Sequence, residues 1–584
     1  MHCTTNTMEA DIRHMKWWGW GYEDVTFDDS TKPELWPYLK RELGVSKIRW
    51  DKPVAFEDVI LPEQKNNEAF LAAIQAGLGD GQIVDDKKSR LVHAAGKSFR
   101  DLWLMRHGQV QFAPDCVVYP DTEEDVALVV RAAHEYGVVL VPFGGGSNIA
   151  GCLVPSDRGG RMVVSLDMCR MHRVLEVDRY SLTARIQPGV YGQHLEDQLA
   201  SYGVTLGHFP DSFLHSTLGG WVATRSAGMQ SDIYGKIEDM VISLRMVTPS
   251  GTIITRTVPK SSNGIDIKHL CIGSEGILGV ITEVVVQVHH KPEKEDWYGW
   301  LFPDFKSGLD AIHECHRADC MPTVTRLNDP KKTALSFAFK HPKTGIKDKI
   351  AKAFKWYIGN VKKFDFNQCC LMVVKYEGTP QAFNRIKNLV SAIYKKHRGV
   401  CLGAEPGRSF AKVKFDFPHL RDYVMDRSIM ADVSETATTW DKLRTLHESG
   451  LADVEQAIKD TGVDAWVGCH LSHSYRTGAS LYFTFGCLQR EGREIEQYLY
   501  VKKAAEDAFM QNGGTLSHHH AVGTEHLPWI EEDLSPTGLK AVKVLKAGLD
   551  PNDIMNPGKI IPSEKPLDDW GLSAEAIDEF QSRS

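Results

Sequence analysis

Residues 111–290 consist of short apolar runs that alternate with glycine clusters and helical stretches. Apolar, β-branched runs bounded by Pro or Gly predict β-strands. Five such runs occur at residues 117–119, 138–141, 162–165, 184–186 and 280–288. Residues 122–136 predict a helix, because Glu123, Glu124 and Asp125 supply the acidic first turn that favours a helix N-terminus. Strands and helices are therefore mixed along this part of the chain.

The local amino-acid composition changes three times along the chain, which indicates four regions. Residues 1–110 are charged and Trp-rich, with a helical stretch at 67–78, and predict a largely helical N-terminal region. Residues 111–290 hold the strands described above. In residues 291–500 the glycine clusters thin out and lysines increase, which indicates a second α+β domain. Residues 501–584 begin with a predicted helix at 501–511 and end in a Pro-rich tail, which indicates a C-terminal helical region.

Composition excludes several classes of protein. The 584 residues are 42% hydrophobic and 25% charged, which rules out a disordered or fibrous chain. A formal net charge of −8 argues against a nucleic-acid binder. No apolar stretch approaches the ~20 residues of a membrane span, and no targeting signal is readable. The 12 cysteines are scattered, so we expect a reduced, intracellular protein, cytoplasmic or peroxisomal.

Three loops rich in glycine and hydroxyl residues are the first candidates for a binding site. Glycine lets backbone N–H groups approach an anion closely, so together the loops can wrap a long, phosphate-bearing ligand. Each loop alone could equally be an ordinary glycine-rich loop. The first loop is Pro142, Phe143, Gly144, Gly145, Gly146, Ser147 and Asn148. The second is Asp211, Ser212, Phe213, Leu214, His215, Ser216 and Thr217, continued by Thr224, Arg225, Ser226 and Ala227. The third is Glu275, Gly276, Ile277, Leu278, Gly279, Val280 and Ile281.

In this order, and with the late segment 550–559 (DPNDIMNPGK), the loops resemble those of the vanillyl-alcohol-oxidase-type flavoproteins. The resemblance implies an α+β fold, with a two-subdomain FAD-binding domain at 111–290 and a cap (substrate) domain at 291–500. It also implies that the residues of the three loops bind FAD. Some relatives attach the flavin through a His in the first loop. Because Ser147 and Asn148 stand there in this chain, we expect non-covalent FAD.

Four further segments resemble the alkyldihydroxyacetonephosphate synthase family: residues 16–21 (KWWGWG), 419–422 (HLRD), 479–483 (ASLYF) and 518–520 (HHH). That family exchanges the acyl chain of acyl-dihydroxyacetone phosphate for a fatty alcohol, without net redox change, in ether lipid biosynthesis. The resemblance implies that Tyr482 gives and takes a proton and that Arg421 binds the substrate phosphate. It places five more residues in the active site: Arg326, His208, His518, His519 and His520.

Elementary chemistry agrees with these roles in outline. A guanidinium offers the paired donors that a phosphate dianion requires, and imidazole is a base near neutral pH. A phenol ordinarily has a pKa of ~10, so Tyr482 needs a cationic neighbour or bound flavin to act as a base. The plainer alternatives are a core tyrosine for Tyr482 and a surface salt bridge for Arg421.

Other side chains also have plain interpretations. The triple histidine could be a solvated loop or a metal site, and we expect no metal. His470 and His473 could share one helical face, and we interpret them as local structure. We interpret the tryptophans of residues 16–21 as packing anchors.

Three functions remain open from the sequence. The first is the ether-forming, FAD-dependent transferase acting on acyl-dihydroxyacetone phosphate and a long-chain fatty alcohol. The second is an FAD-linked oxidoreductase of a 2-hydroxy acid such as D-lactate or glycolate, and the third is a flavin-binding protein without catalysis. We further expect a homodimer with some peripheral membrane contact and no nucleic-acid partner.

Overall fold

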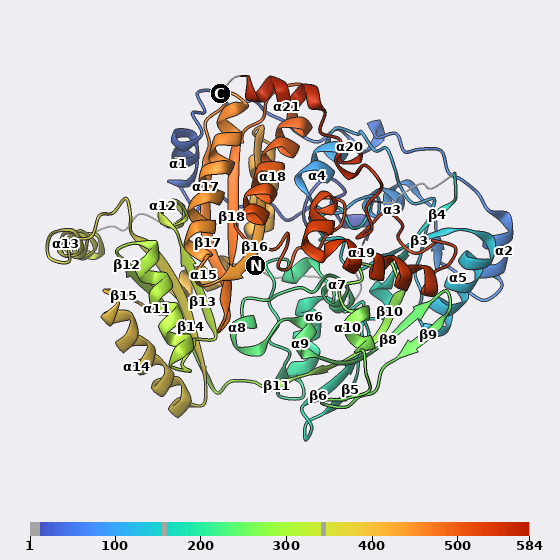
Figure 1. Ribbon diagram of the computed structural model, residues 1–584, viewed down its shortest axis with the longest axis horizontal. Helices are drawn as coiled ribbons and strands as arrows, with labels where there is room; N and C mark the ends of the chain where they lie inside the picture. The colour runs from blue at the N-terminus through green and yellow to red at the C-terminus, as the bar shows by residue number, and fades with distance from the viewer. Residues whose placement is uncertain (1–11, 155–159, 340–345, 583–584) are drawn as a thin grey trace.

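The computed structural model describes residues 12–154, 160–339 and 346–582. A four-stranded and a five-stranded sheet form a first lobe, and a seven-stranded sheet forms a second lobe. Figure 1 shows the two lobes side by side, with part of the C-terminal segment crossing the first lobe. The observed mixture of helices and sheets confirms the α+β class.

The four-stranded sheet has the order β1 (Ile83–Val84), β2 (Cys116–Val118), β4 (Val163–Asp167), β3 (Val139–Phe143). Strands β2, β4 and β3 run parallel, and β1 is antiparallel to β2. Helices α5 (Glu123–Tyr136) and α2 (Glu68–Gln75) pack on this sheet through a shared apolar core. Thr122 caps α5 by accepting the Asp125 N–H, and Gly137 ends the helix at φ +71°. The predicted helix at 122–136 is therefore confirmed.

The five-stranded sheet is antiparallel, with the order β5 (Val174–Asp178), β6 (Thr183–Ile186), β10 (Val280–Gln287), β8 (Val241–Thr248), β9 (Gly251–Ile254). The five strands predicted from apolar runs are all confirmed, each within two residues. Five helices accompany this sheet: α6 (Gly192–Ala200), α7 (Leu218–Thr224), α8 (Ser231–Tyr234), α9 (Ile237–Met240) and α10 (Ile267–Cys271). A short ribbon of β7 (Val204–Thr205) and β11 (His289–His290) lies beside them.

The seven-stranded sheet is antiparallel and presents two different faces. Its order is β15 (Val400–Gly403), β12 (Lys294–Phe302), β14 (Cys370–Gly378), β13 (Val324–Asn328), β17 (Trp466–Ser474), β18 (Gly478–Leu488), β16 (Ile429–Thr439). One face packs against α11 (Phe305–Arg317), α14 (Pro380–Lys396), α17 (Leu443–Asp460) and α18 (Glu494–Gln511). Because strand side chains alternate, Met372 and Val374 join that core, whereas Leu371 and Val373 line a cavity on the opposite face.

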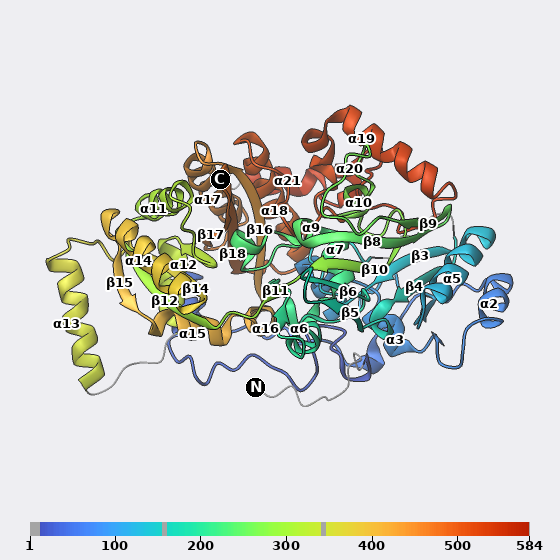
Figure 2. The ribbon, with the colours of Figure 1, turned by 90° about the horizontal axis from the view of Figure 1, so that it is seen from below.

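The remaining helices connect and cover the lobes. Helix α18 begins at Glu494, seven residues before the predicted start, because buried Tyr498 and Leu499 extend its apolar face. Helix α19 (Ile530–Leu549) packs on the five-stranded sheet through Val542, Leu545 and Leu549 (Figure 2). Among the described residues no helix is both long and apolar enough to cross a membrane. The other helices are α1 (Leu35–Glu42), α3 (Lys87–Val92), α4 (Phe99–Arg106), α12 (Pro330–Ala338), α13 (Ile346–Asn360), α15 (Glu405–Val413), α16 (Phe417–Met425), α20 (Pro566–Trp570) and α21 (Ala574–Gln581).

The C-terminal segment completes the first lobe. Met555 forms a parallel bridge with Leu140 of β3, and the Leu140 N–H donates to the Ile554 carbonyl at 2.8 Å. Asp550 accepts the N–H groups of Ile554 and Met555, which shapes this turn. Residues near the end of the chain therefore extend a sheet whose strands lie about 400 residues earlier in the sequence.

Candidate active site

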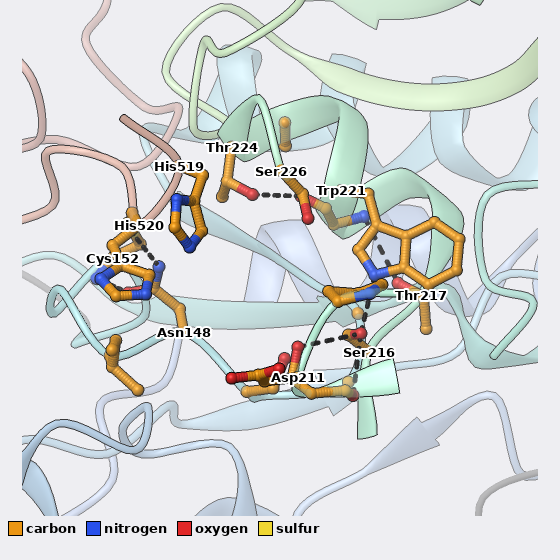
Figure 3. Close-up of a pocket in the computed structure, with 18 of the residues that line it drawn as sticks. Asn148, Cys152, Asp211, Ser216, Thr217, Trp221, Thr224, Ser226, His519 and His520 are labelled. Atoms are coloured by element: carbon orange, nitrogen blue, oxygen red, sulfur yellow. Dashed lines mark hydrogen bonds between the residues drawn. The ribbon is translucent and has the colours of Figure 1, made fainter. Parts of the chain in front are cut away.

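A cavity lies where the two lobes meet, and all three glycine-rich loops contribute to its walls. Figure 3 shows the loop side chains of the first lobe around it, together with two histidines of the C-terminal segment. The second lobe contributes residues from β13, β17 and β18. The loops predicted from sequence are thus brought together at one place.

The first loop is packed so closely on the second that only glycine fits. A Cβ at Gly144 would lie 2.3 Å from Thr217 Oγ1, and one at Gly145 would lie 2.0 Å from the His215 carbonyl oxygen. Gly146 adopts φ +66°, which also favours glycine. The resulting loop exposes its backbone to the cavity.

The second loop leads into helix α7 and is fixed by side-chain caps. Thr217 caps α7 by accepting the Gly220 N–H. The Trp221 indole N–H donates to Ser216 Oγ at 2.7 Å, so the indole forms a fixed wall (Figure 3). The helix N-terminus and hydroxyl groups face the cavity, a setting that suits an anionic ligand group.

The third loop holds the C-terminal segment in place. Glu275 has φ +49° and is buried, and its carboxylate accepts the N–H groups of Val522 and Gly523 at 2.7 and 2.8 Å. The Cys152 thiol donates to the same carboxylate at 3.1 Å. Asn556 donates to the carbonyls of Glu275 and Cys152. The first loop, the third loop and the late DPNDIMNPGK segment are therefore one connected structure.

Opposite the loops, one row of side chains crosses the seven-stranded sheet. In the strand register His470 of β17 pairs with Tyr482 of β18, and Tyr482 pairs with Glu435 of β16. Leu481 and Phe483 point into the apolar core, so alternation turns Tyr482 toward the cavity. The plain interpretation of Tyr482 as a core residue is therefore wrong.

The same register corrects the interpretation of His470 and His473. Both lie on strand β17 and not on a helix. Residues three apart would face opposite sides of a regular strand, but a bulge between Leu471 and His473 restores the register. Both imidazoles line the cavity, so they are more than local structure.

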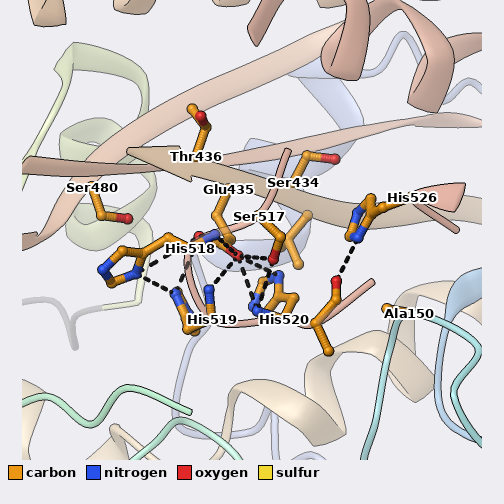
Figure 4. A network of polar contacts seen from close by, with 12 residues as sticks. Ala150, Ser434, Glu435, Thr436, Ser480, Ser517, His518, His519, His520 and His526 are labelled. Carbon is orange, nitrogen blue, oxygen red and sulfur yellow. Dashed lines mark hydrogen bonds and ion pairs between the residues drawn. The ribbon is translucent and has the colours of Figure 1, made fainter. Parts of the chain in front are cut away.

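Glu435 organises the triple histidine and was not predicted from the sequence. Its carboxylate accepts the backbone N–H groups of His518, His519 and His520 at 2.9–3.0 Å and the Ser517 hydroxyl at 2.8 Å (Figure 4). His519 Nδ1 lies 3.2 Å from the second carboxylate oxygen. Asn148 of the first loop donates to the His520 carbonyl on the other side. Residues 518–520 are therefore held between both lobes.

The electrostatics of this cluster follow from burial. Burial opposes ionisation of Glu435, but its contacts with His519, His520 and His518 hold the pKa of its carboxyl well below the ordinary value. Burial lowers the pKa of the His518 and His520 imidazoles well below their ordinary value. An ionised Glu435 carboxylate therefore lies beside the neutral imidazoles of His518 and His520. Burial raises the pKa of the Tyr482 phenol, opposed by the charges of Arg421 and Arg326.

The guanidinium groups of Arg421 and Arg326 line the cavity, and they differ in whether a carboxylate pairs with them. Arg421 donates to Asp432 at 2.5 Å and to the Lys97 carbonyl at 2.8 Å, and its side chain is 11% exposed. The surface-salt-bridge interpretation of Arg421 is therefore wrong. Arg326 packs against the Phe410 ring at 5.4 Å and forms no ion pair with any described residue. Arg326 is thus the cation more available to an anionic ligand.

The KWWGWG segment covers the cavity from the N-terminal side. Asp422 of α16 accepts the Trp20 N–H at 3.0 Å and the Lys16 ammonium at 3.2 Å. A Cβ at Gly19 would lie 2.5 Å from the same carboxylate. Trp17 and Trp20 are buried, and Trp20 lines the cavity, so their interpretation as packing anchors is confirmed.

Besides His215, five residues of the second and third loops do not line the cavity. Phe213, Ile277 and Leu278 pack in the apolar core of the first lobe. Leu214 is 43% exposed at the surface. Arg225 has φ +52° and directs its guanidinium to backbone carbonyls outside the cavity. At these positions the side chains do not reach the cavity, because successive residues of a loop face different sides.

Three predicted histidines are also placed behind the walls. His208 lies under the cavity, with Nε2 3.2 Å from Ser226 Oγ and its ring against Trp221. The His215 ring packs on Trp20, so only its carbonyl supports the first loop. His518 turns away, with Nε2 2.6 Å from the Tyr475 hydroxyl. His519 and His520 are the members of the triple histidine that line the cavity.

Among the residues that the structure describes, two groups of three side chains could hold a metal ion by distance alone. They are His473, His518 and His519, and Glu435, His519 and His520, each with ligand atoms within 4.8 Å of one another. In the second group the Glu435 carboxylate already accepts four donors from residues 517–520. Its oxygens therefore serve the loop backbone.

The donor set of the cavity fits FAD. The cradle formed by Gly144 and Gly145 admits no side chain, so backbone N–H groups stay accessible to a pyrophosphate. Thr217 at the start of α7 and Ser226 add hydroxyl donors. The Tyr482 face of the second lobe supplies the opposite wall for a flat ring system.

Comparison with known proteins agrees with this assignment. Residues 114–257 match the model of an FAD binding domain, and residues 291–560 match that of the C-terminal domain of FAD linked oxidases. Fold and site thus define a flavoprotein of the FAD-linked oxidase class, and FAD is its cofactor. The alkyldihydroxyacetonephosphate synthase of Dictyostelium discoideum is 41% identical over 91% of this chain and 88% of its own length. The enzyme of that name from Trypanosoma brucei brucei is 36% identical over 94% and 93%.

A solved structure supports the same conclusion. A crystal structure of an alkyldihydroxyacetonephosphate synthase superposes with a TM-score of 0.82 at 38% identity, covering 94% of this chain and 99% of that chain. The chain therefore belongs to the alkyldihydroxyacetonephosphate synthase family.

Proposed function

We propose that this protein is an FAD-dependent alkylglycerone-phosphate synthase, which replaces the acyl chain of acyl-dihydroxyacetone phosphate by a fatty alcohol. The observation that carries the proposal is the row of His470, Tyr482 and Glu435 on the sheet face opposite the FAD loops. This row puts a proton carrier and imidazoles across the cavity from the cofactor loops. Family membership points to the same reaction.

A second cavity accounts for the long apolar chains. It has a volume of about 1760 Å³ and shares Arg326, Tyr482 and Phe410 with the first cavity. Away from this junction its walls are mainly apolar, including Leu39, Leu335, Phe339, Ile358, Leu371 and Val424. Burying methylene groups in such a cavity contributes ~0.8 kcal/mol each. A substrate of one phosphate and one long chain therefore has a matching polar end and apolar end.

The residues where the two cavities meet have separate roles in this proposal. Arg326 and Arg421 bind the phosphate, because a guanidinium forms paired, charge-assisted hydrogen bonds. Tyr482 moves the proton at C1, with the imidazoles of His519 and His520 beside it to accept or relay that proton. When bound between the glycine-rich loops and Tyr482, FAD would supply an electron-poor ring system. Glu435 keeps the imidazoles in position.

Helix α13 is the proposed site of peripheral membrane contact. Trp356 is 63% exposed, and Phe354 and Tyr357 are also exposed, beside Lys355 and Lys362. Phe354 and Ile358 line the outer end of the apolar cavity. Both ribbon views show α13 projecting at one end of the molecule (Figures 1 and 2). Aromatic and lysine side chains on one helix suit a bilayer surface, from which long-chain substrates enter.

The test of the function is product formation. Purified, FAD-loaded protein incubated with radiolabelled hexadecanol and palmitoyl-dihydroxyacetone phosphate should yield labelled ether lipid and free palmitate in equal amounts. D-Lactate or glycolate should leave the flavin spectrum unchanged under anaerobic conditions. Bleaching by a hydroxy acid without ether formation would favour the oxidoreductase alternative. Light scattering tests the proposed homodimer in the same preparation.

A further inference from the structure

Lys332 places an ammonium group at the inner end of the apolar cavity. It lies in the first turn of α12, after the N-cap Asp329. Its Nζ lies over the Tyr482 ring, 5.6 Å from the ring centroid. Lys332 lines the second cavity but not the first, so it faces the space for the chain and not that for the cofactor.

The strand beneath the side chain is shaped to admit it. The lysine stem runs across Gly468 of β17, where a Cβ would come within 3.0 Å of Lys332 Cγ. Any side chain at Gly468 would therefore displace the stem. The glycine directs the ammonium along the sheet toward Tyr482, two register positions away.

The ammonium forms no ion pair with any residue that the structure describes. Asp329 is near, but its two oxygens accept the N–H groups of Lys332 and Cys469. Arg326 is a second cation at the same junction. The carboxylates of Asp211 and Asp432 also line this cavity, and Asp432 pairs with Arg421. Burial lowers the pKa of Lys332 to about 7, and Arg326 adds to this effect while Asp329 opposes it. Two cations side by side in an apolar cavity are costly unless an anion joins them.

We propose that Lys332 binds the carboxylate of the fatty acid that the reaction releases. This inference rests on the proposed function. In the exchange, the bond between C1 and the ester oxygen breaks and the bond between C1 and the alcohol oxygen forms. The alcohol proton passes to a base of the site and then to water, and the acyl chain leaves as a carboxylate. The phosphate occupies the arginines, so Lys332 is the cation that the new carboxylate meets at the head of the cavity that holds its chain.

Binding to the FAD-loaded protein without turnover tests the inference. Hexadecanoate and hexadecanol are compared in wild type, Lys332→Met, Lys332→Gln and Lys332→Arg. Both neutral variants should bind hexadecanoate ~10- to 100-fold more weakly, the usual value of a hydrogen bond to a charged group. Hexadecanol affinity should stay within about twofold, because the apolar walls are intact, and Lys332→Arg should retain part of the hexadecanoate affinity. Lys331→Met is the matched control, since Lys331 lies one residue earlier, is exposed and pairs with Glu42.

The outcomes separate this inference from the proposed function. Equal hexadecanoate affinity in wild type and both neutral variants, with ether synthesis intact, overturns the role of Lys332 alone. A parallel loss of dihydroxyacetone phosphate affinity would assign Lys332 to the phosphate and also overturns it. If hexadecanoate binding depends on Lys332 but the protein makes no ether, the proposed function is refuted and the carboxylate site at Lys332 is supported. FAD content and melting temperature confirm that each variant is folded.

Discussion

Replacing Glu435 by Gln tests whether the histidine loop must be anchored for turnover. The change keeps the size of the side chain but removes its charge and one acceptor oxygen. Four donors of residues 517–520 now bind the carboxylate, at 2.8–3.0 Å. Hydrogen bonds to a charged group contribute ~1.5–3 kcal/mol and neutral ones ~0.5–1.5 kcal/mol. With partial relaxation of the loop, the loss is on the order of 2–4 kcal/mol.

We expect this loss to appear mainly in catalysis. If the loop holds His519 and His520 against Tyr482, a cost of ~2–4 kcal/mol in the transition state lowers turnover ~30- to 1000-fold. The assay is ether formation at saturating alcohol, with FAD content and melting temperature measured on the same sample. Glu506→Gln is the control, because Glu506 is equally buried, lies near His526 and does not line the cavity. Full turnover in Glu435→Gln would refute the anchoring role, and a colourless, unstable protein would reduce Glu435 to a structural residue.

The remaining predictions concern the site, the cofactor and pH. Tyr482→Phe should stay folded and yellow while turnover falls ~10²- to 10⁴-fold; an active variant would remove Tyr482 from the mechanism. Acid precipitation should leave FAD in the supernatant, whereas flavin in the pellet would show a covalent link. Arg421→Ala should destabilise the fold by ~3–5 kcal/mol, because it leaves Asp432 buried without a partner, and adding Asp432→Asn should restore stability but not substrate affinity; recovery of both would exclude Arg421 from phosphate binding. Burial lowers the pKa of His208 and His215 to about 3, so their contribution to stability is complete above pH ~6.5 and is lost as pH falls, by ~2 kcal/mol per histidine at pH 5. Melting temperatures from pH 8 to 5 should show this loss, and His208→Asn should flatten the slope by about one proton.

The cofactor loops were predictable because their chemistry is local. A run such as Gly144–Gly146 signals close backbone approach wherever it lies in the fold, and the structure shows what approaches it. Not every side chain of these loops faces the cavity: Phe213 and Leu278 are apolar, and they pack in the core of the first lobe. The glycine and hydroxyl residues within each loop therefore predict the cavity lining better than the continuous loop range does.

The Tyr482 side of the site depends on contacts between distant strands. Nothing near Glu435 in the sequence connects it to residues 518–520, because their contact follows from the pairing of β16 with β18. The run 429–439 holds two carboxylates among apolar and hydroxyl residues, Asp432 and Glu435, and the sequence does not tell which partner each one has. The spacing of His470 and His473 is compatible with one helical face, because the bulge that brings them to the same face of a strand cannot be read from spacing alone. Likewise, the partner of Arg421 could not be identified before α16 was placed against β16.

The bridge between Leu140 and Met555 has a consequence for biosynthesis. The strand that Met555 joins leaves the ribosome early, and the last strand of the five-stranded sheet ends at Gln287, yet the cofactor cavity is closed by residues about 270 positions further along. At ~5–20 residues per second, synthesis of that interval takes roughly 15–50 s. During this time the first lobe exists with its sheet edge and glycine loops open. FAD should therefore bind only after most of the chain has been synthesised. A chain that ends before residue 550 should accumulate as a flavin-free protein with an exposed strand edge.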